Sequence, residues 1–171
     1  MLAGQRVFVT SNSYNGNLKG ALANGFVGAD RKCADEAYAA GLPGGVWKAV
    51  LSSSTVAASS NVTIGRNVYN ISASPGRIAT DSTDFFDGAH AEPILQPNGS
   101  SWVGSNLRVW SNFNDTGVIP GGSLHCNDWT DGTSGLTGNT INHENANSSG
   151  WASLNLSKTC SSTARLYCIS Q

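Results

Sequence analysis

The last stretch of the chain constrains the fold more than any other. It runs Cys160-Ser-Ser-Thr-Ala-Arg-Leu-Tyr-Cys168-Ile-Ser-Gln, and residues 164–169 are predicted to form a strand. The two remaining cysteines, Cys33 and Cys126, lie far away in the sequence. If all four cysteines are oxidised, this strand is tied to two distant places and lies in the middle of the fold. Four cysteines allow three pairings, and the residues alone leave all three open.

The cysteine pattern favours disulfides over a metal site. No two cysteines form a CxxC pair, and no Cys/His spacing matches a zinc site. Buried free thiols are the alternative. Disulfides predict an extracellular protein or one on a cell or virion surface. Residues 1–5 have neither the charged leader nor the apolar core of a signal peptide. We therefore expect that an export signal was removed, that the chain belongs to something larger, or that it leaves the cytosol by another route.

Length and charge exclude several classes of partner. The 171 residues predict a single domain over residues 1–171, long enough to bury a real core. Charged residues make up only 12% of the chain, and its ten Lys and Arg residues are spread without a run. We expect no nucleic-acid partner and no heparin binding. No stretch approaches the ~18–20 apolar residues that a membrane span needs, so no membrane insertion is expected.

The clearest helix is predicted at about residues 30–41. Asp30 is the expected N-cap, and Gly41 is the expected C-terminal stop. Apolar residues recur at helical spacing at Cys33, Ala34, Ala37 and Tyr38. Cys33 therefore faces inward.

Short strands dominate the rest of the chain. Residues 46–51 alternate, which predicts a strand with Trp47 and Leu51 buried. Residues 52–60 have room for a helical turn. Further strands are expected at residues 6–10, 62–69, 107–110 and 151–154. Irregular structure is expected at residues 72–104, 111–122 and 131–150.

Three blocks of the sequence resemble a known family. Residues 30–53, Asp-Arg-Lys-Cys-Ala-Asp-Glu-Ala-Tyr-Ala-Ala-Gly-Leu-Pro-Gly-Gly-Val-Trp-Lys-Ala-Val-Leu-Ser-Ser, resemble the helix-plus-strand block of endostatin-like domains. These are C-terminal collagen modules with a C-type-lectin-like fold. The block is still more similar to that of bacterial relatives, exported lectin-like domains of unassigned function. Residues 109–130 resemble the middle block and residues 160–169 the end block, so the likeness covers about half of the chain, in order.

The resemblance implies a particular architecture. We expect one α+β domain of the C-type-lectin-like, endostatin-like kind, with a mixed or antiparallel sheet, one main N-terminal helix and long irregular loops. It also implies nested disulfides, Cys33–Cys168 and Cys126–Cys160. The family therefore chooses one of the three pairings.

The calcium–sugar site of C-type lectins is not expected here. That site needs a Glu-Pro-Asn or Gln-Pro-Asp triplet and a Trp-Asn-Asp triplet, whose oxygen atoms hold the ion. Gln96-Pro97-Asn98 is similar to the first triplet but lies too far before Cys126, and it is interpreted as a plain turn. Residues 151–153, Trp-Ala-Ser, keep the Trp but replace the Asn and the Asp, so the carboxylate that the ion needs is absent. We expect no cofactor; calcium is possible but unsupported by these triplets.

Two groups of acidic and amide residues are secondary candidates. Asp81, Asp84 and Asp87 are spaced by three residues and do not match an EF-hand loop. They are interpreted as a capping or turn cluster, with a calcium site as the alternative. The second group is Asn127, Asp128 and Asp131. It is interpreted in the same way, as Asx-type turn anchors.

Aromatic and histidine residues complete the candidates. Four tryptophans are expected in the core: Trp47, Trp110, Trp129 and Trp151. Trp102, beside Asn98, is the expected ligand-stacking residue. Endostatin's zinc depends on histidines at its N-terminus, and this N-terminus has none, so zinc is not carried over. The three histidines are isolated in the sequence, and His143-Glu144 is expected to be solvated.

The sequence therefore predicts a non-catalytic recognition module. Its ligand is a glycan or a protein, bound by the loops at about residues 96–123 and 127–149, with Trp102, Asn98, Asn127, Asp128 and Asp131 as candidate contacts. An alternative is a structural subunit or tip of a surface fibre or virion that packs against copies of itself. An enzyme on the same scaffold is the weaker alternative, because no Gly-x-Ser-x-Gly elbow or phosphate loop occurs.

Overall fold

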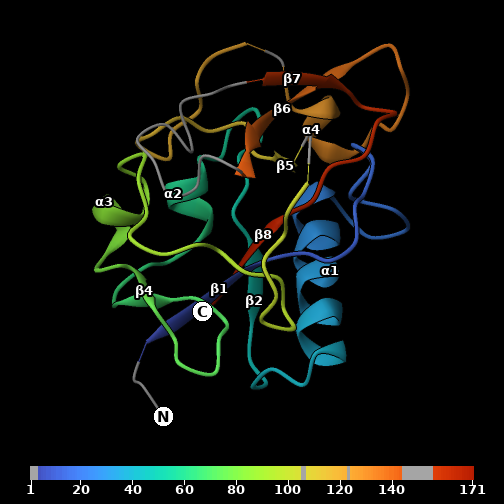
Figure 1. Cartoon of the computed structure of the whole chain (residues 1–171). Coiled ribbons are helices and arrows are strands. Elements are labelled where there is room, and N and C mark those ends of the chain that lie inside the picture. The colour runs from blue at the N-terminus through green and yellow to red at the C-terminus, as the bar shows by residue number, and fades with distance from the viewer. Residues whose placement is uncertain (1–3, 105–106, 123, 144–155) are drawn as a thin grey trace.

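Two β-sheets and one long helix, α1, form the framework of the protein (Figure 1). The computed structural model describes residues 4–104, 107–122, 124–143 and 156–171. The five-stranded sheet has the order β2-β8-β1-β3-β4, and the three-stranded sheet has the order β5-β6-β7. The protein is thus a mixed α+β fold, as the sequence predicted at this coarse level.

The closing stretch of the chain is an interior strand, as predicted. Strand β8 (Tyr167–Ser170) pairs antiparallel with β1 (Gln5–Val9) on one side and with β2 (Trp47–Ala49) on the other. Strand β3 (Val68–Tyr69) pairs parallel with β1, and β4 (Arg77–Ala79) forms the edge. The expected strand at residues 164–169 begins later than predicted. Ala164 makes only an isolated bridge to Tyr14.

The three-stranded sheet is antiparallel throughout. It consists of β5 (Arg108–Trp110), β6 (Thr137–Asn142) and β7 (Leu156–Thr159). Strand β6 lies inside the segment 131–150 that was predicted to be irregular. Its sequence Thr-Gly-Asn-Thr-Ile-Asn lacks the apolar alternation that identifies strands, and its buried polar residues pair with the neighbouring strands instead.

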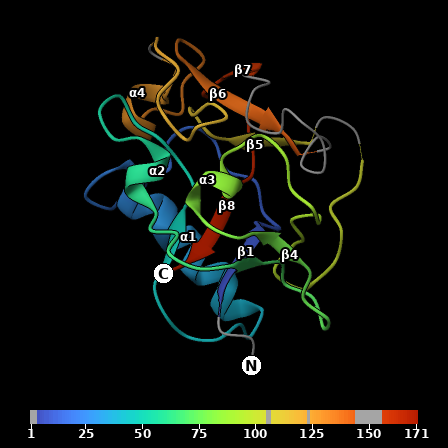
Figure 2. The same cartoon turned by 90° about the vertical axis from the view of Figure 1, so that its left-hand side faces the viewer.

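The five-stranded sheet separates two hydrophobic clusters because strand residues alternate between its faces. Phe8 and Cys168 face the cluster that includes the inner side of α1, and Val7 and Ile169 face the other cluster. The second face is covered by α2 (Ala58–Asn61) and α3 (Ser82–Phe85) (Figures 1 and 2). The helical turn expected in residues 52–60 is thus α2.

Helix α1 (Gly25–Ala39) begins earlier than predicted. Its N-cap is Asn24, whose Oδ1 accepts a hydrogen bond from Val27 N at 2.9 Å. Asp30, the predicted N-cap, instead accepts a hydrogen bond from Ala49 N at 2.8 Å and ties α1 to β2. Burial raises the pKa of the Asp30 carboxyl.

The first turn of α1 contains glycines because other chain segments approach it closely. A Cβ atom at Gly25 would collide with the carbonyl oxygen of Asp128, and one at Gly28 would collide with that of Leu18. Such glycines lower the expected helix propensity, which explains why the sequence pattern placed the helix start at residue 30. Tertiary packing overrides that preference here.

The predicted C-terminal end of the helix is confirmed. Gly41 has φ +68°, in the left-handed region that glycine adopts without steric cost. Its amide donates to Tyr38 O, and the amide of Leu42 donates to Ala37 O. These two bonds form a Schellman motif, which satisfies the last carbonyls of the helix.

Two disulfides connect these elements as the family resemblance implied. Cys33 on α1 is bonded to Cys168 on β8, and Cys126 is bonded to Cys160. All four cysteines are fully buried. Disulfides favour a location outside the reducing cytosol. Within the described ranges, no helix is long and apolar enough to cross a membrane.

Two further segments differ from expectation. Only Val68–Tyr69 of the expected strand 62–69 is a strand, because the backbone of Thr63 bonds to side chains, accepting from Gln5 Nε2 and donating to Gln171 Oε1. The segment 72–104 contains β4 and α3. The expected strand 151–154 lies outside the described residues.

Candidate functional site

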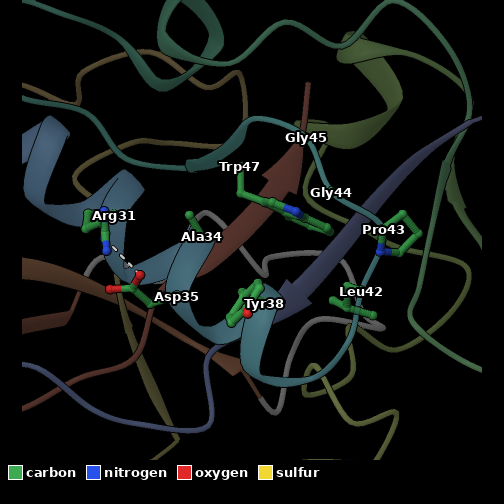
Figure 3. Close-up of a pocket in the computed structure, with 9 residues that line it drawn as sticks. All are labelled: Arg31, Ala34, Asp35, Tyr38, Leu42, Pro43, Gly44, Gly45 and Trp47. Carbon is green, nitrogen blue, oxygen red and sulfur yellow. Dashed lines mark ion pairs between the residues drawn. The ribbon is translucent and has the colours of Figure 1, made fainter.

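A hollow of about 420 Å³ lies on the outer side of α1 (Figure 3). It is bounded by the exposed stripe of the helix, by the turn that follows, and by the start of β2. Its lining consists of Arg31, Ala34, Asp35, Tyr38, Leu42, Pro43, Gly44, Gly45 and Trp47. The volume falls in the range of small-molecule sites, roughly 300–1,000 Å³.

The helix that forms one wall has two distinct faces. Ala29, Cys33 and Ala37 are buried, and Cys33 is bonded to the central strand β8. Arg31, Asp35 and Tyr38 lie on the opposite stripe, because residues four and seven positions apart share one face of a helix. The sequence pattern had grouped Tyr38 with the inward residues. It is 87% exposed, because the inward face is centred on Cys33 and Ala37.

Glu36 connects the same helix to the segment 11–14. Its buried carboxylate accepts hydrogen bonds from Ser11 N at 2.5 Å, from Asn12 N at 3.0 Å and from the Tyr14 hydroxyl at 2.8 Å. Burial, together with the bond to Glu36, raises the pKa of Tyr14 above its usual range. The helix is thus held both by a disulfide and by a buried charge with several donors.

The polar part of the hollow is one ion pair. Arg31 Nε donates to Asp35 Oδ1 at 2.8 Å, and the two side chains are 68% and 60% exposed. Among the contacts of the described residues, Arg31 has no other partner. Its two terminal NH₂ groups and the second oxygen of Asp35 are therefore open to a ligand.

The apolar part of the hollow consists of the Tyr38 and Trp47 rings, the Leu42 and Pro43 side chains and the Gly44-Gly45 turn. Trp47 is almost fully buried and packs on Phe8 with ring centroids 5.0 Å apart. Gly44 and Gly45 leave their surroundings open, since a Cβ atom at either would meet nothing within 4 Å. Figure 3 shows the Tyr38 side chain on the helix and the Trp47 side chain on the other wall. This lining offers stacking and hydrogen bonding to a bound molecule.

A second hollow of similar size, about 430 Å³, lies beside α3. Its lining is Ser82, Thr83, Phe86, Asp87, Asp115 and Thr116. Its one aromatic residue, Phe86, is buried and stacks edge-on against Phe85 and Phe113. It therefore lacks the exposed ring that the hollow on α1 presents.

Asn98 and Asp128, both predicted contacts, lie near opposite ends of α1. Asn98 shares a small depression with Ala39 and Ala40, at the C-terminal end of the helix. The carbonyl oxygen of Asp128 approaches Gly25, at the N-terminal end. Fifteen helical residues span about 20 Å, so these two residues do not share one small-ligand site.

Asn98 itself forms part of a turn, as the plain-turn interpretation predicted. Its Oδ1 accepts hydrogen bonds from Ser100 N at 3.0 Å and from Ser100 Oγ at 2.6 Å. The amide of Gly99 donates to Gln96 O at 2.8 Å, which closes the turn.

Trp102 packs against its own protein rather than standing free. The guanidinium of Arg165 lies 4.1 Å from its ring centroid, and the ring of His143 lies 5.0 Å away. Arg165 also donates to Gln96 Oε1 at 3.0 Å. Trp102 thus borders the core, and its predicted ligand-stacking role stays a prediction.

His143 was expected to be solvated, which is wrong. It is buried, and its Nδ1 lies 3.0 Å from the hydroxyl of Tyr167. Burial, with the nearby charge of Arg165, lowers the pKa of His143 to about 4. The sequence offered only its position in a polar segment, which did not reveal that β6 carries it into the core.

Asn127 and Asp128 lie within the short helix α4 (Cys126–Trp129), and Asp131 follows it. The helix is a left-handed turn in which every φ is between +48° and +62°. Asp128 accepts hydrogen bonds from Ser54 N at 2.6 Å and from Ser54 Oγ at 2.8 Å. Asp131 accepts from Thr133 N at 2.6 Å, an Asx-type turn. Hydrogen bonds from the side chain and from the backbone of Thr133 lower the pKa of Asp131. Asn127 donates to Thr130 Oγ1.

The three aspartates near α3 cap backbone groups, as their capping interpretation predicted. Asp81 is the N-cap of α3, and Asp84 accepts hydrogen bonds from both Thr80 N and Thr80 Oγ1. Asp87 accepts from Ala89 N. In the parts of the chain that the structure describes, no three His, Cys, Asp or Glu side chains gather as a potential metal site.

The predicted core tryptophans are confirmed where they are described. Trp47, Trp110 and Trp129 are buried, and Trp129 Nε1 donates to Ser52 O at 2.7 Å. Trp151 lies outside the described residues. The hollow on α1 was not predicted, although the spacing of Arg31, Asp35 and Tyr38 already placed them on one helical stripe.

Comparisons of the sequence with protein-family models and with curated proteins returned no match.

Proposed function

We propose that the protein is a non-catalytic recognition module that works outside the cytosol and binds a glycan or a protein in the hollow on α1. The observation that carries this proposal is the Tyr38 ring, 87% exposed beside an open hollow. Tyrosine is enriched among the residues that dominate binding interfaces, and here its ring borders an open hollow.

The way α1 is held supports recognition. Its inner face is fixed to β8 by the Cys33–Cys168 disulfide and to the segment 11–14 by Glu36. A site on a rigid element loses little conformational entropy when it binds. The lining contains a single carboxylate, Asp35, already paired with Arg31, which suits binding better than acid–base chemistry.

We also propose a C-type-lectin-like, endostatin-like fold for the domain. A C-type-lectin-like, endostatin-like domain accounts for the order of the elements, the interior terminal strand and the nested disulfides. The predicted contributions of the loops at residues 96–123 and 127–149 stay predictions. Self-association as a fibre or virion subunit is the competing role.

A blocking substitution with a matched control tests the proposal. Gly44→Leu adds a side chain to a residue that lines the hollow, and Gly65→Leu adds one to a different depression. A Cβ atom meets no neighbour within 4 Å at either position. The wild type and both variants are applied to arrays of glycans and extracellular proteins. We expect saturable binding that Gly44→Leu removes and Gly65→Leu retains.

Two different results would contradict the proposed binding in the hollow on α1. Binding that both variants retain would move the site away from α1. If nothing binds, and light scattering instead finds a regular oligomer, the self-association role replaces recognition.

A further inference from the structure

The charge of the hollow on α1 limits what it binds. Its lining contains one cation, Arg31, and one anion, Asp35, which neutralise each other at 2.8 Å. A phosphate, a sulfated sugar or a strongly charged peptide would gain attraction from one partner and repulsion from the other. An uncharged polar ligand suffers no such repulsion.

The ion pair also presents hydrogen-bonding groups of both kinds. The terminal NH₂ groups of Arg31 donate, and the second oxygen of Asp35 accepts. A hydroxyl group can donate and accept, so two neighbouring hydroxyls on one ligand can engage both side chains together. Neutral amides and alcohols can each satisfy part of this arrangement, but a vicinal diol satisfies both halves.

The aromatic wall supplies the complementary surface. The exposed Tyr38 ring lies on the same helical stripe, one turn beyond Asp35. Trp47, Leu42 and Pro43 continue the apolar lining. A ligand that matches this wall has a flat C–H face on one side and hydroxyls along its rim.

We infer that the hollow on α1 binds one neutral hexopyranose unit of a glycan. This inference rests on the proposed recognition function and specifies its ligand. The pyranose stacks its C–H face on Tyr38, and two neighbouring hydroxyls bond to Arg31 and Asp35. The open, shallow form of the site predicts weak binding of one unit, with a Kd on the order of 1 mM, strengthened when several units are displayed together.

The test is a titration of ¹⁵N-labelled protein with neutral methyl hexopyranosides, up to about 50 mM, far above the expected Kd. We expect saturable shifts of the amides of Tyr38, Gly44 and Gly45 with at least one hexopyranoside. Tyr38→Ala should weaken binding roughly fivefold to tenfold, whereas Tyr38→Phe should stay within about twofold because the ring remains. Asp35→Asn should also weaken binding, and Gly65→Leu should leave it unchanged.

The failures of this inference and of the proposed function are separable. No saturation by any hexopyranoside, or binding that Tyr38→Ala leaves unchanged, overturns the sugar assignment. If a protein or peptide binds the hollow, is blocked by Gly44→Leu and is not displaced by sugars, the sugar assignment fails and recognition stands. If no macromolecule and no sugar binds, both fail. Thermal unfolding of each variant confirms that a loss of binding is not a loss of fold.

Discussion

Glu36 is the buried charge that fixes α1, and its partners are donors. It lies on the inner side of the helix and accepts from two backbone amides, from Asn12 Nδ2 and from the Tyr14 hydroxyl. Hydrogen bonds to a charged group contribute about 1.5–3 kcal/mol each, far more than exposed ion pairs do. The residue therefore connects the segment 11–14 to α1.

The Glu36→Gln substitution tests this connection. It keeps the shape but replaces one acceptor oxygen with a donor that faces donors, so we expect the free energy of unfolding to fall by about 3 kcal/mol. Urea denaturation measures the change. Asp35→Asn, on the exposed side of the same helix, is the control and should change it by less than about 0.5 kcal/mol. Equal effects of the two would contradict the role given to Glu36.

Two buried histidines make the stability depend on pH. Burial lowers the pKa of His90 and of His143 from 6.5 to about 4. In the unfolded chain both bind protons as the pH falls through 6.5, while in the folded protein they stay neutral until about pH 4. Acid therefore favours the unfolded state, and the cost at pH 4 is about 3 kcal/mol for each histidine.

We expect the free energy of unfolding to fall by about 1.5 kcal/mol per histidine between pH 6.5 and pH 5. Urea midpoints measured across this range give the slope. His143→Gln keeps a polar partner for the Tyr167 hydroxyl but does not titrate, so its slope should be about half that of the wild type. An unchanged slope in this variant would show that His143 does not cause the effect.

The sequence predicted whether a residue is buried only where the local apolar pattern matches the face that the fold buries. The inward cysteine of α1 and the buried Trp47 and Leu51 follow from periodicity. Tyr38 and His143 do not, because an apolar residue at the border of a helical face is exposed here, and a polar segment runs through the core as β6. Neither outcome is decided within a few residues of sequence.

At the scale of the element, the start of α1 depends on two glycines at which backbones meet. Gly28 lies against the carbonyl of Leu18, and Gly25 lies against that of Asp128. A helical glycine is usually a weak point, about 1 kcal/mol worse than alanine. Here its missing side chain is what permits the packing.

Gly28→Ala should therefore destabilise the protein, although the higher helix propensity of alanine alone would stabilise it. We expect a loss of at least about 2 kcal/mol, because the new Cβ must displace the backbone of Leu18. Gly44→Ala, in open space, is the matched control and should stay within about 0.5 kcal/mol. Thermal or urea unfolding of both variants decides the matter, and a stabilised Gly28→Ala protein would rule out the close approach.

The elements that the sequence predicted are those with strong local signals. The C-terminal half of α1 has a regular pattern and a glycine stop, and β1, β2 and β5 are short apolar runs. Strand β6 consists of Thr, Gly and Asn around one Ile, and its pairing with β5 and β7 is a property of the assembled sheet. The hollow on α1 depends on how the helix and β2 meet, so it could not be derived from either alone.

At the scale of the whole molecule, the two disulfides are nested. Cys33–Cys168 joins residues 135 positions apart, and Cys126–Cys160 joins residues 34 positions apart. In the chain-entropy model, loops of these lengths stabilise the folded state by about 5 and about 4 kcal/mol. The Cys33–Cys168 disulfide also holds α1, on which the hollow lies, against β8.

Replacing each pair by alanines separates the two contributions. We expect Cys33→Ala/Cys168→Ala to lower the free energy of unfolding more than Cys126→Ala/Cys160→Ala does, by about 1 kcal/mol from loop entropy alone. Denaturant unfolding of the two double variants at neutral pH gives both values. The reverse order would mean that the α4 region contributes more to global stability than the central sheet does.

Strand β8 and the residue after it, Gln171, lie between β1 and the start of β2. Gln5 on β1 donates to Ser170 O at 2.6 Å, and the amide of Gln171 donates to Val46 O, beside the rim of the hollow (Figure 1). A fused tag or a sensor-chip linkage at Gln171 therefore lies close to the hollow whose ligand is sought. Ser157 on the exposed strand β7, at the opposite end of the molecule, is the better attachment point for binding measurements.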